Sequence, residues 1–192
     1  MALYEGQRND AGEREGYGTM RFHSGAAYEG EWRAGVREGH GEMLYAGNES
    51  YAGEWRANQR EGRGTYRYAD ASVYEGEWAD GRREGVGRYT FANGCVFEGE
   101  YRAGRREGKG TFTFANGTTQ IVRYEEGRPV REGARWSADH AGAPSTLDGR
   151  QVAWRLKDGE VVEGIGLDEA VQIARRAGMD VPRALMSAHT AG

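Results

Sequence analysis

The chain is short of cysteine, of proline and of long apolar runs. Its single cysteine, Cys95, excludes an internal disulfide framework and fits a reducing compartment, with Cys95 as a small apolar filler. With 3 prolines beside 32 glycines, the glycine does not mark a proline-rich linker. No apolar run approaches the roughly 18 residues of a membrane helix, and the N-terminus lacks a signal-peptide pattern. We therefore expect a cytoplasmic chain whose glycines have a structural role.

A strong excess of charge is missing too. The 26 basic and 30 acidic side chains leave a formal net charge of -4. A nucleic-acid-binding domain is usually strongly basic, because the phosphate backbone is polyanionic. The sequence therefore predicts no nucleic-acid partner.

Catalytic and metal-binding motifs are also scarce. His23, His40, His140 and His189 are scattered without an HxxxH spacing or a cysteine pair, so we expect no bound metal. The segment EGVGRYTF at 84–91 lacks the third glycine of a dinucleotide-binding loop and leads into a predicted strand. No Gly-x-Ser-x-Gly elbow occurs. We expect neither a cofactor nor enzymatic activity.

The sequence is rich in an internal repeat, which is best tested before any single motif. Four copies start 23 residues apart, and an earlier copy from Tyr4 is 24 residues long. The four are YEGEWRAGVREGHGEMLYAGNES from Tyr28, YAGEWRANQREGRGTYRYADASV from Tyr51, YEGEWADGRREGVGRYTFANGCV from Tyr74 and FEGEYRAGRREGKGTFTFANGTT from Phe97. Paired carboxylates such as Glu75 and Glu77 recur in most copies, which indicates solvated charge rather than one active site.

Within a copy, rings and glycines alternate with polar residues. Tyr74, Gly76 and Trp78 keep this period of two, and so do the positions from Gly85 to Phe91. Each copy is therefore predicted to form two antiparallel strands with the rings and glycines on one face. The parity predicts these neighbours: Gly76 opposite Gly87, Tyr74 opposite Tyr89, Trp78 opposite Gly85, and Trp78 beside Gly64 of the preceding copy.

The pattern YEGEWxxGxxxGxG at this period resembles the signature of MORN (membrane occupation and recognition nexus) repeats, from residue 4 to about residue 119. The resemblance implies a mainly β fold: an elongated single-layer antiparallel sheet of stacked β-hairpins with aromatic rows along one face. It also implies a scaffold that docks proteins in cytoskeletal, ciliary or membrane-junction assemblies. The chain departs from the common pattern by placing Arg-Glu-Gly before each second strand, Asn58 at a turn glycine, and Arg8 where the first copy needs tryptophan.

The last third of the chain loses the repeat. QVAWRL and EVVEGI, with Lys157-Asp158-Gly159 between them, predict a hairpin, and the apolar spacing of LDEAVQIARRAG predicts a helix. That helix either packs over the open end of the sheet or binds a partner or a second copy. The expected parts are five MORN repeats over 1–119, a degenerate capping half-repeat over 120–137, a loop over 138–150, a hairpin plus helix (167–177) over 151–182, and a disordered tail over 183–192.

Two surfaces are candidates for function. The first is the aromatic face, where rings left partly exposed would anchor an extended peptide or helix of a protein partner. The same rings could instead serve only to hold the sheet together, and both interpretations stay open. The predicted binding residues are Tyr28, Trp32, Tyr51, Trp55, Tyr74, Trp78, Phe97 and Tyr101.

The second candidate is a basic edge at the hairpin turns, which would bind anionic phospholipid as a peripheral membrane module. Nearby glutamates would neutralise part of its charge, so we expect any membrane association to be weak. A homodimer is compatible with either surface. The arginines predicted for this edge are Arg37, Arg60, Arg82, Arg83, Arg105 and Arg106.

Overall fold

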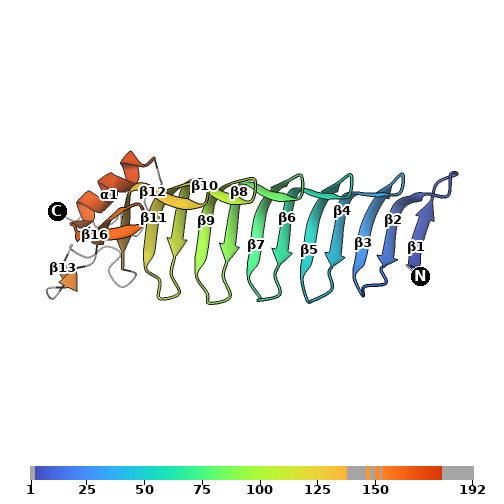
Figure 1. Cartoon of the computed structure of the whole chain (residues 1–192), viewed down its shortest axis with the longest axis horizontal. Coiled ribbons are helices and arrows are strands. Elements are labelled where there is room, and N and C mark those ends of the chain that lie inside the picture. Colours follow the sequence, from blue (N-terminus) through green and yellow to red (C-terminus); the bar gives the residue numbers. More distant parts are fainter. Residues whose placement is uncertain (1–2, 138–145, 148–149, 152, 179–192) are drawn as a thin grey trace. The chain divides into compact units, whose positions relative to one another are not determined.

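The computed structural model describes residues 3–137, 146–147, 150–151 and 153–178. The chain divides into two compact units, Met1–Ala92 and Asn93–Gly192. In each unit the strands lie side by side in the order of the sequence and form an open antiparallel sheet (Figure 1). One helix is present in the described part of the chain. The predicted fold class, mainly β with stacked hairpins, a C-terminal hairpin and a short helix, is confirmed.

The first unit consists of four hairpins. Each copy supplies one hairpin, and the second strand of a copy also pairs with the first strand of the next. This continuous pairing satisfies the backbone polar groups of the inner strands. The strands are β1 (Leu3–Arg8), β2 (Arg14–Arg21), β3 (Ala27–Arg33), β4 (Val36–Leu44), β5 (Ser50–Arg56), β6 (Gln59–Arg67), β7 (Val73–Ala79) and β8 (Arg82–Thr90).

The register confirms part of the predicted pairing and corrects the rest. Gly76 lies opposite Gly87, and Tyr74 lies opposite Tyr89, as the parity predicts. Trp78, however, pairs with Arg83 on β8 and with Gly62 on β6. The predicted positions of Trp78 opposite Gly85 and beside Gly64 are therefore both wrong. Gly64 pairs with Gly76, and its carbonyl accepts a hydrogen bond from the indole nitrogen of Trp78.

A β-bulge in every second strand explains this difference. Between β5 and β6, Gly53 pairs with Gly64 and Glu54 pairs with Glu61, so Gly62 and Arg63 have no partner on β5, although both pair with β7. Gly62 has a φ of +56°, which L-residues with a side chain rarely adopt. The glycine of the Arg-Glu-Gly motif is therefore the bulge residue, and the two extra residues leave the alternation of faces unchanged.

Two-residue loops close the hairpins that follow the first one, whose loop spans residues 9–13. Ala34 and Gly35 both have positive φ, 47° and 80°, and Ala57 and Asn58 repeat this geometry with 48° and 70°. Two successive positive φ angles define the type I′ turn, whose twist matches that of paired strands. Asn58 is therefore an acceptable substitute for the turn glycine, because asparagine tolerates the left-handed conformation.

The exposed alanine of the first such turn is expected to limit stability. The left-handed conformation costs an alanine roughly 1–2 kcal/mol, and asparagine is favoured there. We expect Ala34→Asn to raise the free energy of unfolding by about 1 kcal/mol, measured by urea denaturation. Ala46→Asn is the matched control, since Ala46 is exposed in a loop and is not among the residues with positive φ. An equal gain from both substitutions would contradict the turn argument.

The second unit continues the hairpins and ends in a different arrangement. Its main sheet runs in the order β9, β10, β11, β12, β15, β16. The predicted loop over 138–150 lies largely outside the described residues, apart from parts of a short two-stranded ladder, and the predicted tail over 183–192 lies entirely outside them. The strands are β9 (Val96–Arg102), β10 (Arg105–Thr113), β11 (Thr119–Glu125), β12 (Arg128–Trp136), β13 (Thr146–Leu147), β14 (Arg150–Gln151), β15 (Ala153–Lys157) and β16 (Glu160–Gly164).

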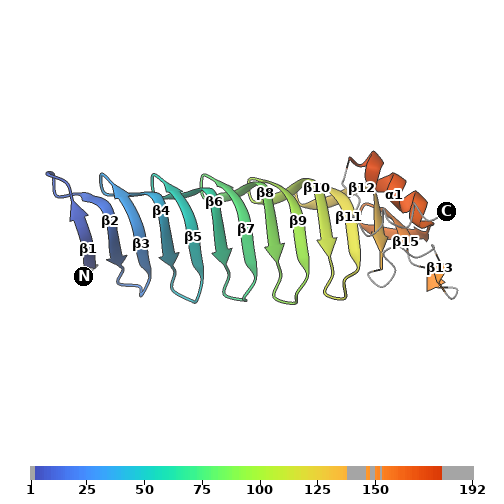
Figure 2. The same cartoon turned by 180° about the vertical axis from the view of Figure 1, so that it is seen from behind.

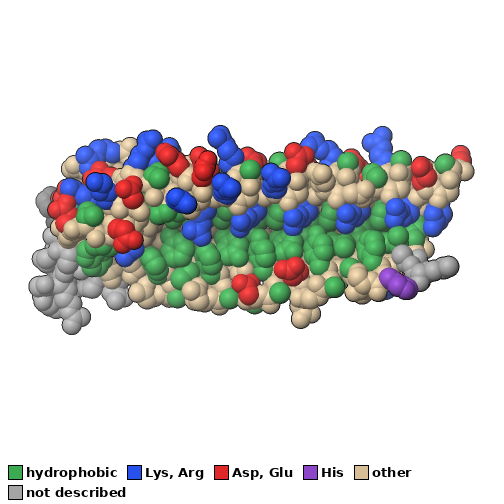
Figure 3. All heavy atoms as spheres, in the orientation of Figure 1, with side chains coloured by type: hydrophobic (Ala, Val, Ile, Leu, Met, Phe, Trp, Pro, Cys, Tyr) green, Lys and Arg blue, Asp and Glu red, His purple; other side chains and the backbone are tan. Residues whose placement is uncertain are grey.

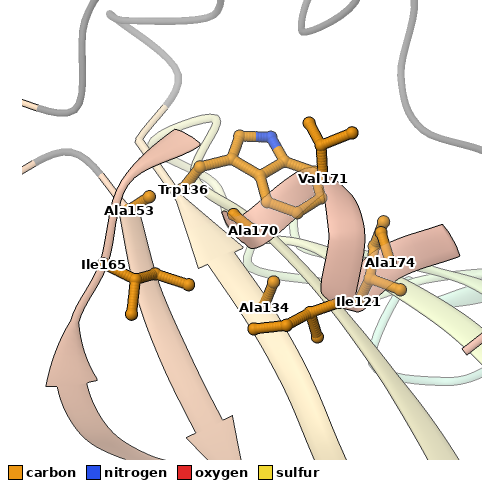
Figure 4. Close-up of a cluster of buried hydrophobic side chains, with 9 residues drawn as sticks. Ile121, Ala134, Trp136, Ala153, Ile165, Ala170, Val171 and Ala174 are labelled. Atoms are coloured by element: carbon orange, nitrogen blue, oxygen red, sulfur yellow. The ribbon is translucent and has the colours of Figure 1, made fainter. Parts of the chain in front are cut away.

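The helix α1 (Leu167–Arg176) covers one face of this sheet. It contacts β12 and β15, as the two opposite views show (Figures 1 and 2). Its apolar side packs against Ile121, Ala134 and Trp136 in a cluster of buried side chains (Figure 4). The helix thus packs on the last strands of the sheet, and the apolar residues that it buries belong to their face rather than to the edge strand.

Candidate functional site

All eight rings predicted to bind a partner are buried. Four of them have an exposed fraction of zero, and the other four are 4–5% exposed. The expectation of partly exposed rings at these positions is wrong. The fully buried rings are Tyr28, Tyr51, Tyr74 and Phe97, and the nearly buried ones are Trp32, Trp55, Trp78 and Tyr101.

In the first unit these rings form a zipper that joins each copy to the next. Tyr28 contacts Trp32 of its own copy and Trp55 of the following copy, with ring centroids 5.0 Å and 5.4 Å apart. Tyr51 repeats this with Trp55 and Trp78, at 5.1 Å and 5.3 Å. All four contacts are edge-to-face, the geometry that the ring quadrupoles favour.

The polar atoms of these rings are also used inside the array. The hydroxyl of Tyr51 donates to the carbonyl of Glu54 at 3.0 Å, and the indole nitrogen of Trp55 donates to the carbonyl of Gly41 at 3.0 Å. Burial raises the pKa of the Tyr51 hydroxyl well above its usual value. The rings therefore hold the copies together and expose almost no surface to a partner.

In the five repeats the arginine of the Arg-Glu-Gly motif lies on the ring face. The guanidinium of Arg37 lies 4.3 Å from the centroid of Trp55, and that of Arg60 lies 4.4 Å from Trp78. Each also donates to the next hairpin turn, Arg37 to the carbonyl of Asn58 at 2.9 Å and Arg60 to that of Gly81 at 2.6 Å. Cation–π contact and turn capping thus combine in one side chain.

The glutamate of the motif caps the same turn from the other side. The carboxylate of Glu38 accepts the backbone N–H of Ala57 at 2.9 Å, and that of Glu61 accepts the N–H of Asp80 at 3.2 Å. The preference of this chain for Arg-Glu-Gly therefore has a structural cause: the arginine and glutamate bind the following turn, and the glycine forms the bulge.

This arrangement separates the six arginines of the predicted lipid-binding edge. Arg37, Arg60, Arg83 and Arg106 all lie over rings, whereas Arg82 and Arg105 are exposed at the turns. The six thus do not form one exposed ridge. A lipid-binding role is left with Arg82 and Arg105 as its exposed cations, and it stays a hypothesis.

A different set of rings in the first unit is accessible. Tyr45, Tyr68 and Phe91 occupy the same position in successive copies, just after the second strand, and Tyr89 lies near the end of β8; all four are half-buried. Tyr66 lies among them and is buried. Ring contacts connect the five in the order Tyr45, Tyr66, Tyr68, Tyr89, Phe91, with centroids 4.5–5.8 Å apart. We call these five residues the aromatic strip.

The hydroxyl groups of the aromatic strip differ in their hydrogen bonding. Tyr66 donates to Glu49 at 3.0 Å, and Tyr89 shares a 2.7 Å hydrogen bond with Ser72. Burial, with the Glu49 hydrogen bond, raises the pKa of Tyr66 to about 12. The hydroxyls of Tyr45 and Tyr68 make no hydrogen bond to any residue that the structure describes.

A row of positive charge lies on the same face, and its last member, Arg60, lies 5.0 Å from the ring centroid of Tyr66 in the aromatic strip. Arg14, Arg37 and Arg60, which we call the arginine row, are half-buried on β2, β4 and β6. Within the described residues none of the three forms an ion pair with a carboxylate. The pKa of Arg37 is lowered, chiefly by burial and also by the charge of Arg14. Over the first unit, Figure 3 shows a band of hydrophobic side chains with Lys and Arg along its border.

Sequence reasoning placed Tyr89 and Phe91 on the ring face but did not include this series, or the arginines beside it, among the residues of that face that could bind a partner. Arg60 alternates with Gly62, Gly64 and Tyr66, so it belongs to the same face as the rings. Tyr68 continues that series at the next position of the same parity, beyond the end of β6. Tracking the parity through the turn would have placed both residues on the ring face.

The second unit has a similar contact between an arginine and a ring, beside a hollow. Arg135 lies 5.2 Å from the centroid of Phe114 and donates to Gln120. Phe114, Arg135 and Trp154 are among the residues that line a hollow of about 390 Å³.

In the described part of the chain, no three His, Cys, Asp or Glu side chains gather as metal ligands. No helix there has the length and apolar character needed to cross a membrane.

The comparisons with solved structures give distant similarities. The TCP domain of SAS-4 (dCPAP) of Drosophila melanogaster, in complex with a proline-rich motif of Ana2 (dSTIL), is 13% identical, with a TM-score of 0.45, over 72% of this chain and 73% of that one. The G-box domain of the microcephaly protein CPAP is 12% identical, with a TM-score of 0.38, over 80% and 97%. The TCP10 domain of Danio rerio CPAP is 10% identical, with a TM-score of 0.27, over 86% and 99%. With TM-scores below 0.5, we base no inference on them.

The family model gives a clear result. No curated protein sequence matches the chain. The MORN repeat model, in contrast, matches five consecutive segments, 10–27, 28–49, 51–73, 74–96 and 97–119. Together they cover more than half of the chain, and they coincide with the copies whose hairpins, rings and bulges are described above. The chain belongs to the MORN repeat family.

Proposed function

We propose that the protein is a non-catalytic scaffold that docks a protein partner on the aromatic strip. The observation that carries the proposal is the contrast between the two sets of rings. Tyr28 and Trp55 are buried and fully used in the zipper, whereas Tyr45 and Tyr68 are half-buried with unused hydroxyls. Tyrosine is a favoured anchor at protein interfaces, because it combines apolar area with one hydrogen-bonding group.

The repeat architecture supports the same role. A sheet built from similar copies presents the same groups at regular intervals, which suits an elongated ligand rather than one reacting centre. Tyr45, Tyr68 and Phe91 form such a series. A partner bound along it would place the protein as an adaptor in a cytoskeletal, ciliary or membrane-junction assembly.

The test compares tyrosines on the two faces of the first unit. We expect the Tyr45→Ala/Tyr68→Ala variant to stay folded and to lose its specific partners in quantitative proximity labelling, by about tenfold in recovery. Tyr17→Ala is the matched control. Tyr17 is 60% exposed, and by the alternation of β2 it lies on the face opposite to the glycines. Its removal should leave the partner profile unchanged.

Retention of all partners by the folded double variant would overturn the proposal. A parallel assay addresses phospholipid. If Arg82→Glu/Arg105→Glu abolishes sedimentation with anionic vesicles while the tyrosine variant retains its partners, the membrane hypothesis replaces the scaffold. Low salt gives the clearest contrast, since surface charges are screened within about 10 Å at 0.1 M salt.

A further inference from the structure

We propose that the ligand of the aromatic strip is a polyproline II peptide with an acidic residue at every third position, lying across the strands. This inference rests on the proposed function and adds the chemistry of the partner. Three features of the first unit carry it: the charge of the arginine row, the spacing of the copies, and the hydroxyls of Tyr45 and Tyr68.

The charge of the arginine row indicates an acidic partner. Arg14, Arg37 and Arg60 are held half-buried, and no carboxylate of the described chain neutralises them. Each guanidinium donates a hydrogen bond to the carbonyl of a turn residue; that of Arg14 donates to Gly35 at 2.5 Å. A guanidinium has five N–H donors, so the remaining donors can bind a carboxylate. Such charge-assisted hydrogen bonds are stronger than neutral ones.

The spacing selects the conformation of that partner. Arg14, Arg37 and Arg60 lie on β2, β4 and β6, so neighbours are separated by two strand spacings. Neighbouring strands lie about 4.8 Å apart, which gives about 9.6 Å between successive arginines. A polyproline II helix has three residues per turn and a rise of 3.1 Å, so residues i and i+3 lie about 9.3 Å apart on one side. One acidic residue per turn therefore meets one arginine per copy.

Other conformations fit this spacing less well. In a β-strand, side chains on one face recur every two residues, at about 6.7 Å or 13.4 Å. In an α-helix, positions i and i+7 share a face at about 10.5 Å, so the mismatch over two intervals is about 1.8 Å. For polyproline II the corresponding mismatch is about 0.6 Å.

The aromatic strip suits the backbone of such a peptide. Polyproline II has no internal hydrogen bonds, so its carbonyls are free to accept them. Tyr45 and Tyr68, one copy apart, present hydroxyl donors that no described residue uses. Their half-buried rings offer flat apolar surface to proline rings, as in the known aromatic-lined grooves for proline-rich peptides.

The experiment measures peptide binding to the full chain by fluorescence anisotropy. The probe is a labelled twelve-residue peptide with glutamate at every third position and proline elsewhere. Its isomer has the same composition with the four glutamates adjacent. We expect the periodic peptide to bind at least about tenfold more tightly than the isomer, and about tenfold more weakly to Arg60→Gln. Arg67→Gln is the matched control, since Arg67 is exposed on the opposite face of the same strand.

Equal affinity for the two isomers, or no binding of the periodic peptide, would overturn the inference. This comparison uses only the wild-type chain, so it holds even where Arg60→Gln lowers stability. Thermal melts of both arginine variants separate unfolding from lost contacts. If the periodic peptide does not bind while the Tyr45→Ala/Tyr68→Ala variant still loses its cellular partners, the scaffold function stands and the inferred ligand is wrong. If that variant keeps its partners, the proposed function fails as well.

Discussion

Replacing Trp55 by alanine is expected to lower the free energy of unfolding by about 3–5 kcal/mol, the usual cost of removing a buried tryptophan. Trp55 is 4% exposed and packs between Tyr28 and Tyr51. The guanidinium of Arg37 covers it, and its indole nitrogen holds the carbonyl of Gly41. The substitution thus removes the contacts of one copy with the copy before it as well as those inside its own hairpin.

The measurement is urea denaturation followed by circular dichroism. Val86→Ala is the control, because Val86 is an apolar residue that is 62% exposed, and we expect a change within about 0.5 kcal/mol. Trp55→Phe keeps a ring and removes the indole donor, so it should cost clearly less than Trp55→Ala. A loss below about 1 kcal/mol for Trp55→Ala would show that the zipper does not hold the copies together.

This prediction changes how binding data on such variants are interpreted. A Trp55→Ala/Trp78→Ala protein that loses its partners has also lost the ring packing at two successive copies, since both indoles are buried. In a repeat array each copy is stabilised mainly by its neighbours, so damage at one copy spreads to the adjacent interfaces. Only half-buried positions such as Tyr45 and Tyr68 separate binding from folding.

The fold of the repeats was predictable because its determinants are local and repeated. The pairing of Gly76 with Gly87 follows from alternation alone, and the structure confirms it. The bulge was not predictable from alternation, since two extra residues at Gly85 shift the register without changing the face. Trp78 was consequently placed opposite the wrong residue.

The site was less predictable because exposure depends on packing between copies. Tryptophan is a common anchor at interfaces, and only the three-dimensional structure shows that Trp32 makes edge-to-face contacts with Tyr4 and Tyr28. The roles of Arg37 and Glu38 in capping the next turn likewise join residues 19 to 21 positions apart, which no short motif reveals.

The second large effect is expected from adding one methyl group at Gly53. A Cβ at this position would lie 2.5 Å from the carbonyl oxygen of Arg63 and 2.5 Å from the Cα of Gly64, both of them backbone atoms of β6, and 2.7 Å from the hydroxyl of Tyr51. Real Cβ atoms essentially never approach so closely, so the two strands must separate. We expect Gly53→Ala to cost about 3 kcal/mol, the upper part of the range for overpacking, in the same urea experiment.

Gly64→Ala supplies the contrast, because the collision there has a different source. A Cβ at Gly64 would meet the ring and hydroxyl of Tyr51, with the ring Cε2 at 2.5 Å. Exchanging Tyr51 for the smaller leucine should therefore reduce the cost of Gly64→Ala strongly and that of Gly53→Ala much less, because the two backbone contacts at Gly53 remain. The coupling energies come from two double-mutant cycles. Equal coupling in both cycles would contradict the distinction between close strand approach at Gly53 and ring packing at Gly64. Unequal coupling would assign the two glycines of one facing pair to two separate packing requirements of the repeat.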